Sequence, residues 1–482
     1  MFGYYFKLAL RSFKRNKVLT ALMVLAIALG IGASMTTLTV FHVLSGDPIP
    51  QKSDKLFYPR IEPRSKNGAI PGEEPEEQMT RFDAEALLRD KRGDRQAVMT
   101  GGNVSVEAQD GKLDPFSAEA RYTSSDFFPM FDVPFQHGSG WSAADDESRA
   151  QVAVISKALN DKLFDGGNSV GKSLLASGNT FRIVGVLDEW RPAPKFYDLT
   201  NDIYNEVEQV FVPFWTSRAL ELGTSGNMNC WGETTDDEGS TGPNAPCSWL
   251  QYWVELDTPA KVETYKQYLA NYSEQQRTAG RFERPTNVRL DSVMEWLDFK
   301  QAVPGDVRLQ VWLAFGFLLV CLLNTVGLLL AKFLRRSSEI GVRRALGASR
   351  RAIFAQCLIE AGTVGLAGGI VGLGLAWLGL WAVRQQPASY LELAHLNPTM
   401  LLTTFALSVV ASLLAGTLPA WMAMQVTPAI QLKSQGSNAP SSACGGGVGW
   451  GQTEPANPRQ YPNTTPHHRP PSQPSPASGG RG

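Results

Sequence analysis

The sequence predicts an α-helical membrane protein with four transmembrane helices and an α+β extracytoplasmic domain inserted between helices 1 and 2. Three observations predict this class. Four long segments carry no charge, basic residues cluster beside only some of them, and the region between the first two has the composition of an ordinary globular domain.

The four uncharged segments each exceed the roughly 20 residues needed to cross a bilayer. In hydrocarbon every backbone polar group must be satisfied internally, so we expect helices. Buried helices of a soluble protein are the alternative, but these segments lack a polar face. The first is too long for a signal peptide and has no small-residue cleavage site, so we expect a retained anchor. The predicted transmembrane helices are 18–45, 309–331, 358–383 and 400–423.

The distribution of basic residues predicts the orientation. They are dense before the first helix and in the connection 332–357, whereas the loop 384–399 carries only Arg384. We therefore expect both termini and this connection in the cytoplasm, and the domain at 46–308 outside it. Residues 1–17 mix aromatic and basic side chains, which favours an interfacial amphipathic helix in contact with membrane lipid. A frayed basic segment is the alternative.

The outer domain contains both strand-like and helical patterns. Strands are predicted at 181–186, 209–214 and 251–256, and helices at 156–164 and 259–276. Cys230 and Cys247 form the one cysteine pair on the oxidising side, so we expect a disulfide, with two free thiols as the alternative.

The residues argue against several kinds of site. A net charge of −1 gives no electrostatic reason to expect a nucleic-acid partner, and five scattered histidines give none to expect metal or triad chemistry. We therefore predict a non-catalytic chain that binds no cofactor or metal. The cytoplasmic tail, 424–482, becomes rich in Pro, Ser and Gly, and we expect disorder after about residue 435.

One phosphate-loop match is a false one. Gly166, Gly171, Lys172 and Ser173 satisfy the pattern G-x-x-x-x-G-K-[ST]. A real phosphate loop lies between a strand and a following helix, whose N-terminus faces the phosphates. Here the predicted helix comes first and the strand follows, so we expect a turn.

The connection 332–357 contains the segment Glu339-Ile340-Gly341-Val342-Arg343-Arg344-Ala345-Leu346-Gly347-Ala348-Ser349-Arg350. Glu339 and Arg343 have the i,i+4 spacing of a helical ion pair, Ile340, Ala345 and Leu346 offer apolar contacts, and Gly347 ends or bends the helix. Without further information, this helix suits docking on a protein and binding to anionic lipid equally well.

This segment resembles the signature of FtsX-like and MacB-like ABC transporter permeases. The stretches 152–156, 163–173 and 181–186 are similar to that family's periplasmic core domain, and 8–17, 418–421 and 426–432 are similar to its terminal segments. The chain opens directly with the interfacial helix, so the resemblance implies a separate ATPase subunit that binds ATP and Mg.

The resemblance implies a multi-pass protein of the bacterial inner (plasma) membrane whose outer domain, 46–308, is periplasmic. It also implies the mechanism. An ABC ATPase would dock on the coupling residues Glu339, Ile340, Gly341, Arg343, Arg344, Ala345, Leu346, Gly347 and Ala348. Its closure would move the outer domain by mechanotransmission, for export, efflux or lipoprotein release. A second permease copy or paralogue and a periplasmic adaptor are the other implied partners. An FtsX-type regulator of a periplasmic hydrolase and a membrane receptor for a periplasmic ligand are the alternatives.

Small and polar residues in the predicted helices suggest how they pack. Gly365, Gly368, Gly369 and Gly372 would let another helix approach closely, either within the four-helix unit or across a dimer. Asn324 is expected to be buried with an interhelical hydrogen-bond partner.

Overall fold

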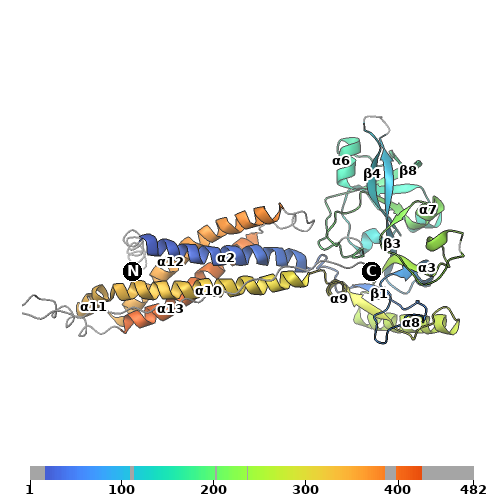
Figure 1. Cartoon of the computed structure of the whole chain (residues 1–482). Coiled ribbons are helices and arrows are strands. Elements are labelled where there is room, and N and C mark those ends of the chain that lie inside the picture. The colour runs from blue at the N-terminus through green and yellow to red at the C-terminus, as the bar shows by residue number, and fades with distance from the viewer. Residues whose placement is uncertain (1–16, 109–112, 201–202, 236, 386–397, 426–482) are drawn as a thin grey trace, which may run out of the picture. The chain divides into compact units, whose positions relative to one another are not determined.

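The computed structural model of the chain describes residues 17–108, 113–200, 203–235, 237–385 and 398–425 (Figure 1). Three predictions fall mainly outside these ranges: the interfacial helix at 1–17, the loop 384–399 and the tail 424–482.

The outer domain follows helix α2 (Lys17–Ser45) and precedes helix α10 (Gly305–Arg335) along the chain. Its strands are β1 (Leu56–Arg60), β2 (Met79–Thr80), β3 (Arg95–Glu107), β4 (Phe116–Thr123), β5 (Phe135–Gly138), β6 (Val152–Ile155), β7 (Ser173–Ala176), β8 (Asn179–Leu187), β9 (Val210–Pro213), β10 (Thr224–Ser225), β11 (Asn229–Cys230), β12 (Cys247–Glu255) and β13 (Arg289–Ser292). Its helices are α3 (Arg81–Asp90), α4 (Phe127–Met130), α5 (Ala143–Glu147), α6 (Lys157–Phe164), α7 (Phe214–Ala219), the 3-10 helix η1 (Gly239–Thr241), α8 (Pro259–Thr278) and α9 (Val293–Phe299).

These strands form one connected sheet in the order β13-β1-β12-β3-β4-β9-β6-β8-β5, with β2, β7, β10 and β11 attached to it. Most neighbours are antiparallel, whereas β4 with β9 and β6 with β8 are parallel. The strands β8, β9 and β12 and the helices α6 and α8 coincide with the segments predicted from sequence. The domain is therefore of the expected α+β type.

Alternating side chains divide the core between the two faces of the sheet. In β12, Tyr252 and Val254 contribute to one apolar cluster and Trp253 to the other. In β1, Phe57 and Tyr58 divide in the same way. Both faces of the central strands are covered, which is why all nine residues of β12 are buried.

A buried ionic cluster fixes the long connection after β8 to the sheet. Arg121 of β4 lies 2.6 Å from Asp198 and also pairs with Glu208, which accepts a further bond from Lys195 at 3.1 Å. Burial alone would raise the pKa of the Asp198 carboxyl, but Arg121 and Lys195 hold it well below its ordinary value. Such a cluster is stable only when every charge keeps its partner.

The remaining helices, α2, α10, α12 (Arg350–Val383) and α13 (Pro398–Met424), pack together. A Cβ atom added to Gly368 of α12 would lie 2.6 Å from Ile27 Cγ2, and one on Gly372 would lie 3.2 Å from the Ala28 carbonyl oxygen. The glycines of α12 therefore allow close contact with α2 inside the chain. Gly365 and Gly369 are also buried.

Three of these helices, α2, α10 and α12, are long and apolar enough to cross a membrane. In α13 the corresponding apolar part is the shorter segment Val409–Met424. The structure thus supports a membrane protein with several apolar helices and an α+β outer domain.

The prediction for Asn324 is wrong: its side chain is exposed on α10. The next residue, Thr325, is buried instead, and its hydroxyl donates to the Cys321 carbonyl at 2.9 Å. Successive helical residues are about 100° apart, so an error of one position exchanges an inward face for an outward one.

Candidate functional site: the basic connection between α10 and α12

Helix α11 (Ser337–Ala345) occupies the connection that carries the sequence signature. The acidic Glu339 lies in its first turn and Arg343 and Arg344 in its last, which matches the polarity of the helix dipole. Glu339 and Arg343 form the predicted i,i+4 ion pair at 3.0 Å. Because both side chains are partly exposed, this pair alone contributes only about 0.3–0.5 kcal/mol.

Other contacts fix α11 to its neighbours. Arg343 donates to Gln356 Oε1 of α12 at 2.9 Å, and Arg344 donates to the Met424 carbonyl of α13 at 3.3 Å. The basic residues of the signature therefore hold α11 against two helices.

The end of α11 is set by backbone geometry. Gly347 has φ of +98°, a conformation that residues with a Cβ rarely adopt. Its N–H donates to the Arg344 carbonyl, and the Ala348 N–H donates to that of Arg343, both at 3.1 Å. The Ser349 hydroxyl then accepts from the Ala352 N–H at 3.2 Å and caps α12. The turn between α11 and α12 is thus specified locally.

A buried ion pair that was not predicted from the sequence joins α10 to α12. Lys332 Nζ of α10 lies 2.7 Å from Glu360 Oε1 of α12, and Arg336 approaches the same oxygen at 3.4 Å. The predicted second transmembrane helix ends at residue 331, which leaves Lys332 in the connection, whereas α10 continues to Arg335. Two cations at i and i+4, together with an acidic residue at the start of an apolar segment, were the available signal.

The apolar side chains of α11 divide between two directions. Ile340 packs with the apolar core of the helices, while Val342 is 58% exposed and Leu346, just after α11, is 83% exposed. Val342 and Leu346 are four residues apart and so lie on one face. Of the predicted apolar contacts, those of Ala345 and Leu346 are not made within the described chain. They leave an outward apolar surface bordered by arginines.

The segment that matches the phosphate loop forms the turn between α6 and β7. Helix α6 ends at Phe164, and Ser173 begins β7, so the segment leads into a strand and not a helix. The ammonium group of Lys172 lies over the Phe164 ring, 4.8 Å from its centre. No helix N-terminus follows the glycines to receive a phosphate.

Cys230 of β11 and Cys247 of β12 occupy paired positions and form a disulfide. It closes the loop that contains η1. Among the described residues, no group of three or more His, Cys, Asp or Glu side chains could hold a metal ion.

The fold and this connection belong to a membrane protein with an outer α+β domain, and comparison with known proteins shows its family. Residues 20–272 match the family described as the MacB-like periplasmic core domain, and residues 311–428 match the FtsX-like permease C-terminal domain. The first match covers more than half of the chain. The chain therefore belongs to the MacB-like and FtsX-like family of ABC transporter permeases.

Individual relatives are distant. The macrolide export ATP-binding/permease protein MacB of Marinobacter nauticus is 24% identical over 445 residues, which cover 89% of this chain and 60% of that protein. An uncharacterized ABC transporter permease, YvrN of Bacillus subtilis, is 27% identical and is matched over 53% of this chain and 56% of its own. The chain spans about three fifths of the length of these relatives.

Among solved structures, the periplasmic region of MacB from Actinobacillus actinomycetemcomitans aligns with a TM-score of 0.33 and 13% identity. That alignment covers 53% of this chain and 96% of the solved one.

Proposed function

We propose that this chain is the permease subunit of an ABC transporter whose separate cytoplasmic ATPase docks on α11. The observation that carries the proposal is the outward apolar surface of Val342 and Leu346 on a helix held rigidly to its neighbours. Exposed apolar side chains bordered by arginines are typical of a protein–protein contact. The ATPase would supply the ATP and Mg site, and this chain would be non-catalytic.

The contacts of α11 support mechanotransmission. Arg343 joins α11 to α12, and the Lys332–Glu360 pair joins α10 to α12, so a displacement of α11 would move both helices. Helix α10 follows the outer domain directly in sequence. ATP-driven closure of the partner would therefore reach the outer domain through α10, with export as the transport direction that the named relatives favour.

The proposal also covers the membrane topology of the chain and its assembly with partners. The chain would cross the bacterial inner membrane four times, with α13 as the fourth crossing, cytoplasmic termini and a periplasmic outer domain. The dense arginines of the connection support this orientation. A second permease copy or a paralogue would complete the transporter, and a periplasmic adaptor would join it outside.

Affinity purification from native membranes tests the docking surface. The tagged wild-type chain should recover an ABC ATPase in stoichiometric amount, and the Leu346→Asp variant should lose it. Ile70→Asp is the matched control, because Ile70 is also apolar and 68% exposed but lies in the outer domain. Equal recovery by all three chains, or no ATPase with the wild type, would contradict the proposal.

A further inference from the structure

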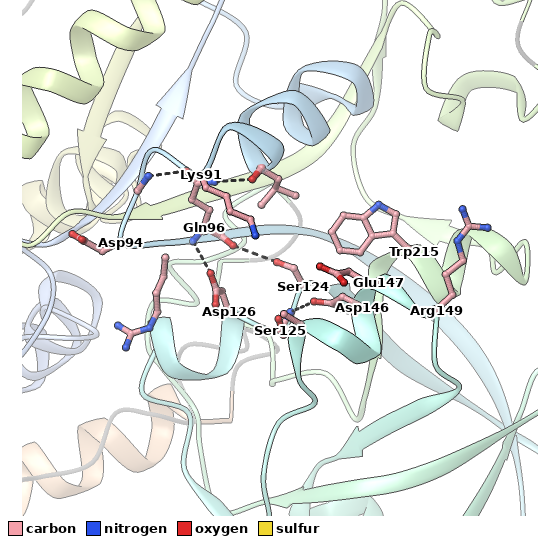
Figure 2. Close-up of a pocket in the computed structure, with 14 residues that line it drawn as sticks. Lys91, Asp94, Gln96, Ser124, Ser125, Asp126, Asp146, Glu147, Arg149 and Trp215 are labelled. Atoms are coloured by element: carbon pink, nitrogen blue, oxygen red, sulfur yellow. Dashed lines mark hydrogen bonds between the residues drawn. The ribbon is translucent and has the colours of Figure 1, made fainter.

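A cavity of about 530 Å³ opens on the outer domain and plays no part in the proposed function. Its lining comes from the end of α3, the start of β3, the turn between β4 and α4, and the helices α5 and α7 (Figure 2). Cavities of 300–1,000 Å³ that combine aromatic and polar walls are typical of sites for small molecules.

One wall of the cavity is held in place by the protein itself. Asp126 accepts from the Gln96 N–H at 3.0 Å. Asp146 accepts from the Ser125 N–H at 2.7 Å and from the Trp141 indole N–H at 2.9 Å. These bonds fix the carboxylates in place without a ligand.

The other charged groups of the cavity differ in their pairing. Arg95 is occupied by Glu255 at 2.8 Å. Within the part of the chain that the structure describes, no ion pair involves Lys91, Glu147 or Arg149. Glu147 of α5 and Trp215 of α7 belong to neighbouring helices, and both line the cavity together with Asp146. In the view of Figure 2, Lys91 and Arg149 lie on opposite sides of Trp215.

Trp215 provides the aromatic wall. Its side chain is half-buried, and its indole packs edge-on against the buried Phe214 with ring centres 5.6 Å apart. The indole is therefore supported from behind while one part of it borders the cavity. An aromatic face with carboxylates next to it is the arrangement that attracts an organic cation, through the ring quadrupole and an ion pair together.

We propose that this cavity binds a small organic cation, whose ammonium or guanidinium group lies between Glu147 and the indole of Trp215. Asp126 and Asp146 add negative charge on the same wall. Lys91 and Arg149 also line the cavity, and their charge would favour the orientation in which the cationic group faces the carboxylates. Binding here requires neither the ATPase nor transport.

Three fluorescent probes with one dansyl body test the sign of the charge. Dansylcadaverine carries a primary ammonium group, its N-acetyl derivative is neutral, and dansylglycine is anionic. Titrated into the full-length chain in mild detergent, dansylcadaverine should bind at least tenfold more tightly than the other two. Equal binding of the cationic and neutral probes would overturn the proposal, because it would mean partition into detergent or an apolar surface.

Variants then locate the site. Glu147→Gln and Trp215→Ala should each weaken dansylcadaverine binding about tenfold, while Trp215→Phe should weaken it less because an aromatic face remains. Glu263→Gln, at an exposed position of α8 outside the cavity, is the matched control and should bind like the wild type. Thermal unfolding of each variant identifies any that fails to fold. A folded Glu147→Gln chain with unchanged binding would overturn the assignment, as would preferred binding of dansylglycine that is lost in Lys91→Ala.

Discussion

Lys332 and Glu360 approach to 2.7 Å between helices α10 and α12, and both side chains are almost completely buried. Arg336 approaches the same Glu360 oxygen. One carboxylate therefore serves two cations from successive turns of α10. Because Lys332 lies in the last turn of α10, the pair joins α10 to α12 close to the start of α11.

Removal of the shared carboxylate should cost more than removal of either cation. Glu360→Gln leaves two cations without their common partner, and we expect a loss of about 3–5 kcal/mol in stability. Lys332→Met should cost less because Arg336 still faces Glu360. Thermal unfolding in detergent measures both, and Arg335→Met, an exposed cation of the same helix, is the control. A greater loss of stability for Lys332→Met than for Glu360→Gln would contradict this account.

The effect of replacing Gly347 should depend on whether the new residue can adopt the positive φ and on the size of its side chain. A Cβ atom there meets nothing within 4 Å, so the cost of Gly347→Ala is conformational, about 1–2 kcal/mol, and Gly347→Asn should cost less. Gly347→Trp adds bulk beside Leu346 and should abolish recovery of the ATPase, whereas Gly347→Asn should retain it. The co-purification described above checks both. Normal ATP-dependent function of Gly347→Trp would be incompatible with docking at this turn.

Asp146 should make the stability of the outer domain depend on pH. Burial raises the pKa of its carboxyl from 3.8 to about 6, despite the donors at Ser125 and Trp141. The folded state then holds this proton more tightly than the unfolded state, so the contribution of Asp146 to stability falls as the pH rises from about 4 to 6.

The Asp146→Asn variant removes this titration. The difference in unfolding free energy between wild type and variant should shift by at most about 3 kcal/mol across that interval, at 1.36 kcal/mol per pKa unit, and stay constant above pH 7. Denaturant unfolding at several pH values measures the difference. A pH-independent difference would show that the Asp146 carboxyl titrates normally.

The Cys230–Cys247 disulfide should stabilise the β11–β12 region. The cysteines are 17 residues apart in sequence, and the chain-entropy relation gives about 3 kcal/mol for a loop of this size. The double variant Cys230→Ser/Cys247→Ser should lose that amount, and addition of a reductant should then have no further effect on its unfolding. Continued sensitivity of the variant to reductant would point to another disulfide.

The elements that could be predicted from sequence are those with a strong local pattern. The apolar runs of α2, α10 and α12, the strands β8, β9 and β12 and the helix α11 each follow from the order of side chains within a single segment. The Glu339–Arg343 ion pair and the end of α11 near Gly347 likewise follow from residues that are close together in the sequence.

Features formed by distant segments could not be predicted in this way. The cavity beside Trp215 joins residues from four separate parts of the chain. Glu360 meets Lys332 because the connection that contains α11 brings α12 back against α10, and the sequence of neither long helix predicts that contact. Asn324 shows the limit within one helix, because an all-apolar segment gives no signal for which polar residue turns inward.

The pairing of β1 with β13 has a consequence for the order in which the chain is made. Phe57 lies opposite Ser292, so the first strand of the outer domain is completed by the last, which emerges from the ribosome just before α10. Until then β1 has an unpaired edge, and the folded domain cannot exist without nearly all of its sequence. The edge of β1 therefore stays exposed and prone to aggregation until residue 292 has been synthesised.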